Sequence, residues 1–304
     1  MDRMGPDPDY GLFATVVELG SFSAAARFHR VSPAMVSKRM SRLERRLGVH
    51  LMHRTTRSLA LTHAGKRFHE DVVAILDSIQ SAEARLLGEQ EILSGPLKIS
   101  APTSFGRLHV APIMTPFLDA HPHLRVELNL TDHLVNLARG GIDLAIRITN
   151  QLSPALIARR LASNRRILCA SPGYLDRFGA PATLDELTRH RVLAAEGQSS
   201  WRLSGPEGVI EWATESFVRT NSSEVVRELA IAGAGVALRS LWDVSEELTA
   251  GRLVRLLPGY EGASDVGIYA VYPQTPFIPA KVSRFVDYLR SAFGPHPPWE
   301  RETP

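Results

Sequence analysis

The chain has 304 residues, enough for two or three domains, and its 44% hydrophobic and 22% charged residues are those of an ordinary globular protein. No apolar run reaches the roughly 18 residues of a membrane-spanning helix, and the acidic N-terminus does not resemble a secretory signal. The single cysteine, Cys169, excludes a disulfide framework and a cysteine-based zinc site, so we expect a cytoplasmic protein without a membrane partner.

Charge is unevenly distributed along the chain. The whole chain has a net charge of +3, whereas residues 27–67 carry eleven Lys or Arg against a single acid, Glu44. The remainder of the chain is therefore acidic. A concentrated basic segment of this kind is typical of a module that binds phosphate groups.

The N-terminal segment has the pattern of short helices. Asp7 to Asp9 can cap a first helix with an inward apolar face, which ends at Gly20. Ser21 then precedes a second helix of small residues, Ala24 to Ala26, that can pack closely on a neighbour.

The third helix is apolar on one side and basic on the other. Ser32 is its expected N-cap and Pro33 its first residue. Its buried stripe comprises Val36, Met40, Leu43 and Leu47. At about 100° per residue, the opposite face carries Ala34, Lys38, Ser41, Arg42 and Arg45. A helix of this kind, entered through a tight turn from a small helix, is typical of a helix-turn-helix.

A short hairpin is predicted at residues 51–61, with Arg54 and Arg57 at its tip. Together with the three helices it predicts a winged helix-turn-helix that binds double-stranded DNA. The alternative is an arginine-rich helix that is only a solvated face. That alternative does not explain why the charge, the cap, the small-residue helix and the hairpin occur together.

A long helix is expected from Thr62, its cap, to about Leu93. Apolar residues recur along it at heptad spacing, which predicts a dimerisation seam. The seam residues are Phe68, Val72, Ile75, Ile79, Ala82 and Leu86. The alternative is a helix that packs on its own domain.

Beyond Ser94 to Pro96 the pattern changes to alternating strands and helices, which predicts a mostly parallel sheet covered by helices. The expected strands are residues 97–101, 124–130, 142–147, 166–170 and 266–272. The expected helices are residues 105–119, 133–139, one starting at Pro172, and 279–293. The proline-rich tail from Gly294 is expected to be disordered.

Several motifs occur together at fixed spacing in residues 13–65. They are Phe13, Gly20 to Phe22, Ala24 to Ala26, Val31, Ser32, Val36, Ser37, Leu43, Glu44, Leu47 to Val49, Leu51, Arg54 to Arg57 and Leu61 to Gly65. This combination resembles the DNA-binding domain of LysR-type transcriptional regulators. The chain departs from it at Pro33-Ala34, where many members have Gln-Pro, and at Met52, where Phe is common.

The resemblance continues through the rest of the chain. The matching residues are Gly95 to Leu97, Pro112, Phe117, His121-Pro122, Gly141 to Arg147, Ser171 to Leu175 and Gly233 to Leu238. Members often have Pro where this chain has Arg239. The resemblance implies a multidomain α plus α/β protein, with a long dimerisation helix and a two-lobed α/β effector domain like that of periplasmic binding proteins.

The implied domains follow the chain in order. They are the winged helix-turn-helix at 1–62, the linker helix at 63–94, lobe I at 95–165 and 266–293, lobe II at 166–265, and the tail at 294–304. The linker helix would pair two chains, and tetramers are usual in the family. RNA polymerase is a further candidate partner.

The expected DNA contacts follow from the helix-turn-helix. Ala34, Ser37 and Lys38 would approach base edges in the major groove, and Arg42 and Arg45 would meet phosphates. Two copies would read a two-fold operator. The wing would reach the adjacent backbone or minor groove. The full expected set is Ser32, Pro33, Ala34, Ser37, Lys38, Arg42, Arg45, Arg54, Thr55 and Arg57.

Effector contacts are expected where helices begin at the carboxyl ends of strands, since free N–H groups point there. The candidates are Thr103, Ser104, Thr131, Asn221 and Ser222 as hydroxyl or amide groups, Arg147 as a cation and Trp201 as an aromatic wall. Because of Arg147, we expect a small organic anion. The alternative for the hydroxyl and amide groups is that they are ordinary N-caps.

The sequence offers little for catalysis and predicts no cofactor and no metal. Gly233-Ala234-Gly235 lacks the third glycine of a dinucleotide fingerprint. His109, His121, His123 and His133 are more consistent with exposed loop residues than with metal ligands, and Cys169 is expected to be buried and inert. Two rival functions remain: a solute-binding or enzymatic α/β protein with a fused basic domain, and a non-specific architectural DNA-binding protein.

Overall fold

A computed structural model describes residues 7–54, 59–87, 92–137, 141–198, 200–213, 215–275 and 278–300. Within these ranges, the side chains of Arg54 and of residues 77–78, 80–82 and 84–87 are not described. The chain divides into two compact units, the first reaching to Ile92 and the second beginning at Leu93. None of the described helices is long and apolar enough to cross a membrane.

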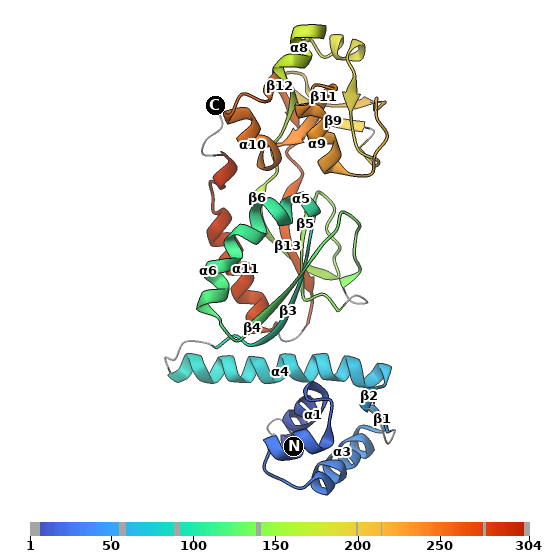
Figure 1. Ribbon diagram of the computed structural model, residues 1–304, viewed down its shortest axis with the longest axis vertical. Coiled ribbons are helices and arrows are strands. Elements are labelled where there is room, and N and C mark those ends of the chain that lie inside the picture. Colours follow the sequence, from blue (N-terminus) through green and yellow to red (C-terminus); the bar gives the residue numbers. More distant parts are fainter. Residues whose placement is uncertain are drawn as a thin grey trace. The chain divides into compact units, whose positions relative to one another are not determined.

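The first unit is a winged helix-turn-helix followed by a long helix (Figure 1). Its elements are α1 (Pro8–Glu18), α2 (Phe22–Phe28), α3 (Pro33–Leu47), β1 (Met52–Arg54), β2 (Leu59–Leu61) and α4 (His63–Leu87). Apolar side chains from all three short helices form its core, including Phe13, Ala25 and Met40. The strands β1 and β2 pair antiparallel. The expected hairpin is thus confirmed, while residues 55–58 of its tip lie outside the described residues.

The two helices of the helix-turn-helix begin at hydroxyl caps. The Ser21 Oγ accepts a hydrogen bond from the Ala24 N–H at 3.3 Å, and the Ser32 Oγ accepts one from the Met35 N–H at 3.2 Å. Pro33 is the first residue of α3, and Gly48 ends that helix with a φ of +67°. Both expected caps are confirmed, because each hydroxyl satisfies an N–H that has no partner within its helix.

The long helix α4 begins as expected and ends earlier. The Thr62 Oγ1 accepts a hydrogen bond from the Gly65 N–H at 2.9 Å, which confirms the cap. The last described helical residue is Leu87, and residues 92–94 are not helical. The expectation that the helix reaches Leu93 is therefore wrong. Leu93 is instead a buried residue of the second unit.

The first part of the apolar stripe on α4 packs within its own unit. The Phe68 ring lies 5.5 Å from the rings of Tyr10 and Phe13, and Val72 is fully buried. Ile75 and Ile79 are half-buried. The side chains of residues 82 and 86 lie outside the described ones. Packing on the same domain therefore accounts for the start of the stripe.

Lobe I of the second unit is a five-stranded sheet in the order β4-β3-β5-β13-β6 (Figure 1). The strands are β3 (Gly95–Ala101), β4 (Leu124–Leu130), β5 (Leu144–Thr149), β6 (Leu156–Ser163) and β13 (Gly267–Pro273). The pairs of β3 with β4 and with β5 are parallel, as expected. The strand β13 is antiparallel to both of its neighbours.

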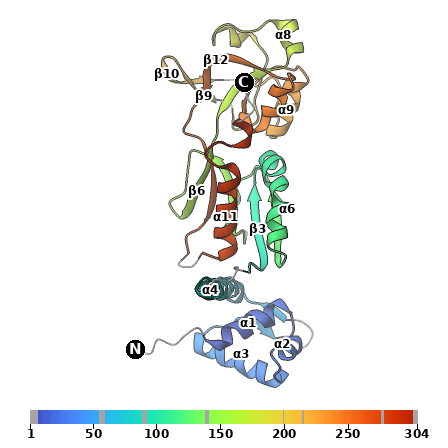
Figure 2. The same ribbon diagram turned by 90° about the vertical axis from the view of Figure 1, so that its left-hand side faces the viewer.

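Helices of lobe I pack beside this sheet. They are α5 (Thr103–Phe105), the π-helical turn η1 (Gly106–Val110), α6 (Ala111–Ala120) and α11 (Ala280–Phe293). The helices α6 and α11 lie side by side, since Phe117 contacts the rings of Phe285 and Tyr288 (Figure 2). The expected helix at 105–119 is thus helical from 103 to 120 but contains a π-helical turn.

Lobe II is a six-stranded sheet in the order β10-β9-β12-β7-β11-β8. Its strands are β7 (Arg166–Ala170), β8 (Val192–Leu193), β9 (Ser200–Gly205), β10 (Gly208–Ala213), β11 (Val236–Ser240) and β12 (Val254–Gly262). Its helices are α8 (Pro172–Phe178), η2 (Glu186–Arg189), α9 (Ser223–Ile231) and α10 (Leu241–Thr249). Only the pair of β8 with β11 is parallel among these described strands.

The chain crosses between the two sheets twice. Asn164 and Arg165 join β6 to β7, and residues 263–266 join β12 to β13. Each lobe therefore depends on segments that are distant in the sequence. The two crossings form the hinge between the lobes.

Three expectations about secondary structure are wrong. The sheets are not mostly parallel, because β13 pairs antiparallel with both of its neighbours and all described pairs of lobe II except that of β8 with β11 are antiparallel. Residues 133–136 are not helical, because the Thr131 Oγ1 accepts the His133 N–H in a tight turn. Residues 138–139 of that expected helix lie outside the described residues. The tail is ordered from Gly294 through η3 (Pro298–Glu300), because Trp299 is buried against the rings of His109 and Phe293.

Candidate DNA-binding and effector-binding sites

The exposed face of α3 carries the residues expected to approach base edges. Ala34 and Lys38 are exposed, and Ser37 is half-buried beside them. The opposite face of the helix is fixed in the core by Val36 and Met40. Because Ser32 and Pro33 set the start of the helix, these side chains are held on a rigid first turn.

Several arginines of α3 are anchored by the start of α1. Asp9 is 1% exposed and accepts hydrogen bonds from the Arg39 Nε at 2.5 Å and the Arg42 Nη2 at 2.7 Å. Arg46 pairs with Asp7. Burial alone would raise the pKa of Asp9, but the hydrogen bonds from Arg42 and Arg39 outweigh it and lower the pKa. Arg42 is thus an ion-pair partner within the unit, although its side chain remains 65% exposed.

Of the remaining residues expected to contact phosphates, only Arg45 has a described side chain. Arg45 is exposed, and its Nε donates to the Ser41 carbonyl at 3.3 Å. Of Arg54, only the backbone in β1 is described. Thr55 and Arg57 lie outside the described residues.

Glu44, the one acid of the basic segment, connects α3 to the hairpin. Its Oε1 accepts hydrogen bonds from the N–H groups of Leu51 at 2.9 Å and Met52 at 3.2 Å. The sequence analysis assigns Glu44 no role, but its position as the single acid among eleven bases indicates an internal partner. Glu44 fixes the position of the wing relative to α3.

The lobe I candidates for effector binding lie at one edge of their sheet. The strands β3, β4 and β5 run parallel, so their carboxyl ends lie together. Thr103 and Thr131 come directly after the carboxyl ends of β3 and β4, and Arg147 lies near the carboxyl end of β5. The Thr103 N–H donates to the Asp132 Oδ1 at 2.9 Å, and Ser104 is buried.

Arg147 has no carboxylate partner among the described residues. Its Nη2 donates to the Val135 carbonyl at 2.9 Å, and desolvation lowers the pKa of the guanidinium. A partly desolvated cation that is not neutralised can take an anionic ligand.

The lobe II candidates lie at the start of α9. The Ser222 Oγ accepts the Val225 N–H at 3.4 Å, so it acts as an N-cap, and Asn221 is exposed. An ion pair connects this turn to lobe I, since the Arg107 Nη2 lies 2.6 Å from the Glu224 Oε1. This contact connects η1 of lobe I to the first turn of α9 in lobe II.

Trp201 does not belong to this set. Its side chain is 1% exposed and lies in the core of lobe II, where its ring is 5.4 Å from that of Trp212. The expectation of an aromatic wall is therefore wrong. The alternation in β9 directs Trp201 and Leu203 to the buried face of the sheet.

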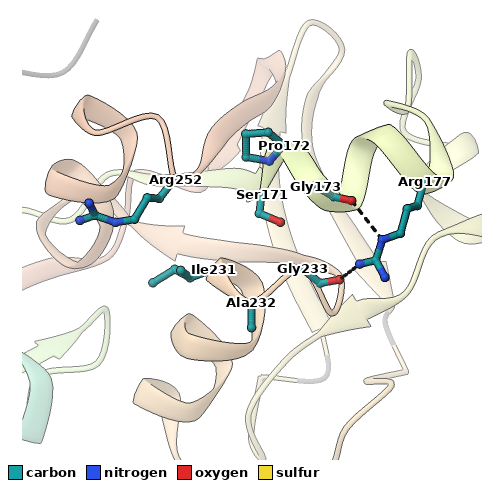
Figure 3. A pocket seen from close by; sticks show the side chains of 8 residues that line it. All are labelled: Ser171, Pro172, Gly173, Arg177, Ile231, Ala232, Gly233 and Arg252. Atoms are coloured by element: carbon teal, nitrogen blue, oxygen red, sulfur yellow. Dashed lines mark hydrogen bonds between the residues drawn. The ribbon is translucent and has the colours of Figure 1, made fainter.

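A hollow of about 530 Å³ lies elsewhere in lobe II, between the start of α8 and the end of α9 (Figure 3). Both of its arginines make hydrogen bonds, but within the part of the chain that is described only Arg252 is paired with a carboxylate. Arg177 donates to the carbonyls of Gly173 at 3.0 Å and Gly233 at 2.6 Å, and Arg252 pairs with Glu247. Arg177 has no carboxylate partner among the described residues, but none of the expected effector residues lines this hollow.

Two further expectations concern Cys169 and His109. Burial raises the pKa of the Cys169 thiol to about 12, so the thiol is inert as expected. The expectation of an exposed loop is wrong for His109. It lies in η1 and packs against Phe105 and Trp299, and its Nε2 is 2.7 Å from the Trp242 carbonyl.

Comparison with known families accounts for both units. A family model described as "LysR substrate binding domain" matches residues 90–294, and "Bacterial regulatory helix-turn-helix protein, lysR family" matches residues 9–66. The chain belongs to the LysR family of transcriptional regulators. This LysR-type regulator binds DNA through its first unit and a small-molecule effector through its second.

Individual relatives match this chain along nearly its whole length. The HTH-type transcriptional regulator DmlR of Escherichia coli (strain K12) is 38% identical over 294 residues, 95% of each chain. The HTH-type transcriptional activator TtdR of the same strain is 35% identical over 285 residues, 92% of this chain and 91% of TtdR. These relatives are regulators, so this LysR-type regulator is not an enzyme.

Solved structures of full-length family members share the fold. CrgA, a LysR-type transcriptional regulator from Neisseria meningitidis, matches with a TM-score of 0.63 and 29% identity, over 96% of this chain and 100% of CrgA. AphB, a virulence activator from Vibrio cholerae, matches with a TM-score of 0.60 and 28% identity, over 94% of this chain and 99% of AphB. The winged helix-turn-helix and the two-lobed effector domain are therefore family features.

Proposed function

We propose that this regulator reads a two-fold operator in the cytoplasm as a dimer or tetramer and responds to a small organic anion. The observation that carries the DNA-binding proposal is the exposed first turns of α3, where Ala34, Ser37 and Lys38 are held by the Ser32 cap. Base edges specify sequence, so these residues would supply specificity. Arg45 and the wing residues Arg54, Thr55 and Arg57 would position the protein on phosphates.

Dimerisation would use the remainder of the α4 stripe. Ile75 and Ile79 are only half-buried within one chain, and Ala82 and Leu86 continue the same heptad spacing. Phe68 and Val72 would support the pairing from within the unit. A paired α4 places two α3 helices on one DNA molecule, which a two-fold operator requires.

The effector proposal depends on Arg147 and on the polar groups at the inter-lobe space. An anion would accept hydrogen bonds from Arg147, from Ser104 and the free N–H groups near Thr103, and from Asn221 and Ser222. The expected response is a change in lobe closure around the Arg107–Glu224 contact. That change would alter the spacing of the two DNA-binding units and their contacts with DNA or RNA polymerase.

The test is fluorescence anisotropy on labelled DNA from upstream of the gene, with a scrambled duplex, across a salt series. If a dimer neutralises about eight phosphates, log K falls with log salt with a slope near −7. Lys38→Ala should cost about 1–3 kcal/mol on the native duplex with little change in slope, whereas Arg45→Ala should reduce the slope by about 1. Arg189→Ala, an exposed arginine of lobe II, is the control.

Equal binding to both duplexes by the wild type would contradict sequence-specific reading. In the same assay, small carboxylates at constant ionic strength should shift the binding curve of the native duplex. A panel that includes acetate, succinate and benzoate and leaves the curve unchanged would contradict the organic-anion class while leaving the DNA result intact.

A further inference from the structure

Four of the described helices end in the same hydrogen-bonded motif, and one of the four differs in its central residue. In this motif one residue after the helix has a left-handed backbone, and the next N–H donates to the carbonyl five positions earlier. At the ends of α3, α9 and α10 the left-handed residue is a glycine, namely Gly48, Gly233 and Gly251. At the end of α2 it is Arg30, with a φ of +55°.

The left-handed backbone is unfavourable for an arginine. In this conformation a Cβ crowds the following carbonyl oxygen, whereas glycine has no Cβ and adopts it freely. Among the described residues, Arg30 and Leu257 are the only non-glycine residues with a positive φ. A glycine at position 30 would therefore end α2 at a lower cost, as glycine does at the ends of α3, α9 and α10.

The residues on either side of Arg30 fix its conformation. The Val31 N–H donates to the Ala26 carbonyl at 2.9 Å, and the Val31 side chain packs against the core of the first unit. The His29 Nε2 is hydrogen-bonded to the Thr15 Oγ1 of α1 at 2.9 Å. Because both neighbours are held in place, Arg30 cannot relax into another backbone conformation without breaking these contacts.

The side chain of Arg30 does not stabilise the fold. It is exposed, and among the described residues it has no ion-pair, hydrogen-bond or aromatic partner. Arg39 and Arg42 of α3 differ from it, because both pair with Asp9. A strained backbone that carries an unpaired cation does not contribute to the stability of the unit, and strain of this kind is typical of functional positions.

Arg30 lies in the turn of the helix-turn-helix, two residues before the Ser32 cap of α3. In such a motif the first residues of the recognition helix enter the major groove. The turn directly before them therefore comes close to the sugar–phosphate backbone at the edge of the groove. A guanidinium matches a phosphate well, because its planar N–H donors can form two parallel hydrogen bonds to the phosphate oxygens.

We propose that Arg30 binds a DNA phosphate, and that the strained turn is retained because it places the guanidinium at this phosphate. This inference rests on the proposed mode of DNA reading, to which it adds a contact outside α3 and the wing. A phosphate contact carries no sequence information, so Arg30 strengthens binding to any duplex and fixes the position of α3 in the groove. The free protein is less stable than it would be with a glycine, and the complex is tighter.

The experiment compares DNA binding of full-length Arg30→Gly and wild type by fluorescence anisotropy on the native and scrambled duplexes. Arg30→Gly should bind both duplexes more weakly by the same factor. The slope of log K against log salt should become shallower by about 0.9 per chain, a loss of about eightfold per chain for each tenfold decrease in salt. Arg30→Lys should retain most of the affinity and the wild-type slope, because it keeps the charge.

Thermal unfolding separates a DNA-binding role of Arg30 from a structural one. Glycine relieves the left-handed strain, so Arg30→Gly should raise the unfolding midpoint of the first unit by about 2–8 °C. All four tryptophans belong to the second unit, so the circular dichroism change without a counterpart in tryptophan fluorescence reports the first unit. A lower midpoint together with weaker binding would make Arg30 structural and overturn the proposal, as would unchanged DNA binding.

The wild type distinguishes failure of this inference from failure of the proposed function. If it prefers the native duplex and Arg30→Gly keeps the wild-type slope, sequence-specific reading stands and the role of Arg30 is refuted. If it binds both duplexes equally, sequence-specific reading is refuted, and a shallower slope for Arg30→Gly still supports the phosphate contact. Arg189→Ala removes an exposed arginine of lobe II and should leave both the slope and the midpoint unchanged.

Discussion

Asp9 illustrates how one side chain can orient a recognition helix. Its carboxylate is buried at the start of α1 and receives hydrogen bonds from Arg39 and Arg42 on α3. Two of the bases counted in the basic segment therefore share the single negative charge of Asp9. Neither ion pair could be predicted from a local pattern, because Asp9 lies 30 residues from Arg39 and 33 residues from Arg42.

Asp9→Asn should destabilise the first unit by about 1–2 kcal/mol, a value reduced because Arg42 is largely exposed to solvent. The Asp9 pKa is lowered in the folded state, so its contribution is present above the unfolded value of about 4. It is lost as the pH falls through the folded pKa. Urea unfolding followed by circular dichroism at pH 7 and at pH 3 measures both effects.

The free energy of unfolding of Asp9→Asn should differ from that of wild type most at pH 7 and least at pH 3. Asp71→Asn changes an exposed carboxyl of α4 in the same unit and should leave stability unchanged. Equal stability of Asp9→Asn and wild type at pH 7 would show that the ion pairs contribute nothing.

At the scale of elements, the junction of the wing with α4 requires a glycine. A Cβ at Gly65 would lie 1.9 Å from the Leu51 carbonyl oxygen, which is backbone and cannot rotate away. The same junction is held by Thr62, whose Oγ1 donates to the His50 carbonyl at 2.7 Å. The close approach of α4 to β1 thus sets the direction in which the long helix leaves the wing.

Gly65→Ala should therefore destabilise the first unit by about 1–3 kcal/mol, the usual cost of overpacking. Gly11→Ala is a matched control, because Gly11 lies in α1 and a Cβ there meets no atom within 4 Å. That control should be neutral or stabilise by up to about 1 kcal/mol. Thermal melts of the two variants should move in opposite directions, and a stabilised Gly65→Ala would contradict the close approach.

Elements defined by local signals could be predicted from the sequence. The caps at Ser21, Ser32 and Thr62 depend on neighbouring residues, and the strands at 124–130 and 166–170 have the expected bounds. Structural features that depend on residues distant in the sequence could not be predicted.

The wrong predictions concern residues whose surroundings are formed by distant parts of the chain. Trp201 is buried because β9 joins a sheet whose other strands come from far along the chain. The tail looked disordered because its composition does not reveal the aromatic cluster that receives Trp299.

At the scale of the whole effector unit, the C-terminal segment belongs to the contact between the lobes. The Trp299 ring lies 4.5 Å from that of His109 and 5.8 Å from that of Phe105, both in lobe I. His109 in turn donates to the Trp242 carbonyl of lobe II at 2.7 Å. The Trp242 Nε1 donates to the Asn164 Oδ1 at the hinge. Trp299 thus supports a chain of contacts that reaches from α11 to the hinge.

Trp299→Ala should destabilise the effector unit by about 3–5 kcal/mol, as expected for truncation of a buried tryptophan. Trp299→Phe should retain most of that stability, because a smaller ring still packs against His109 and Phe293. A chain truncated after Phe293 should unfold like Trp299→Ala, since both lack the same packing. Urea unfolding followed by circular dichroism compares the three variants with wild type. If truncation left the unfolding curve unchanged, residues 294–300 would contribute nothing to the contact between the lobes.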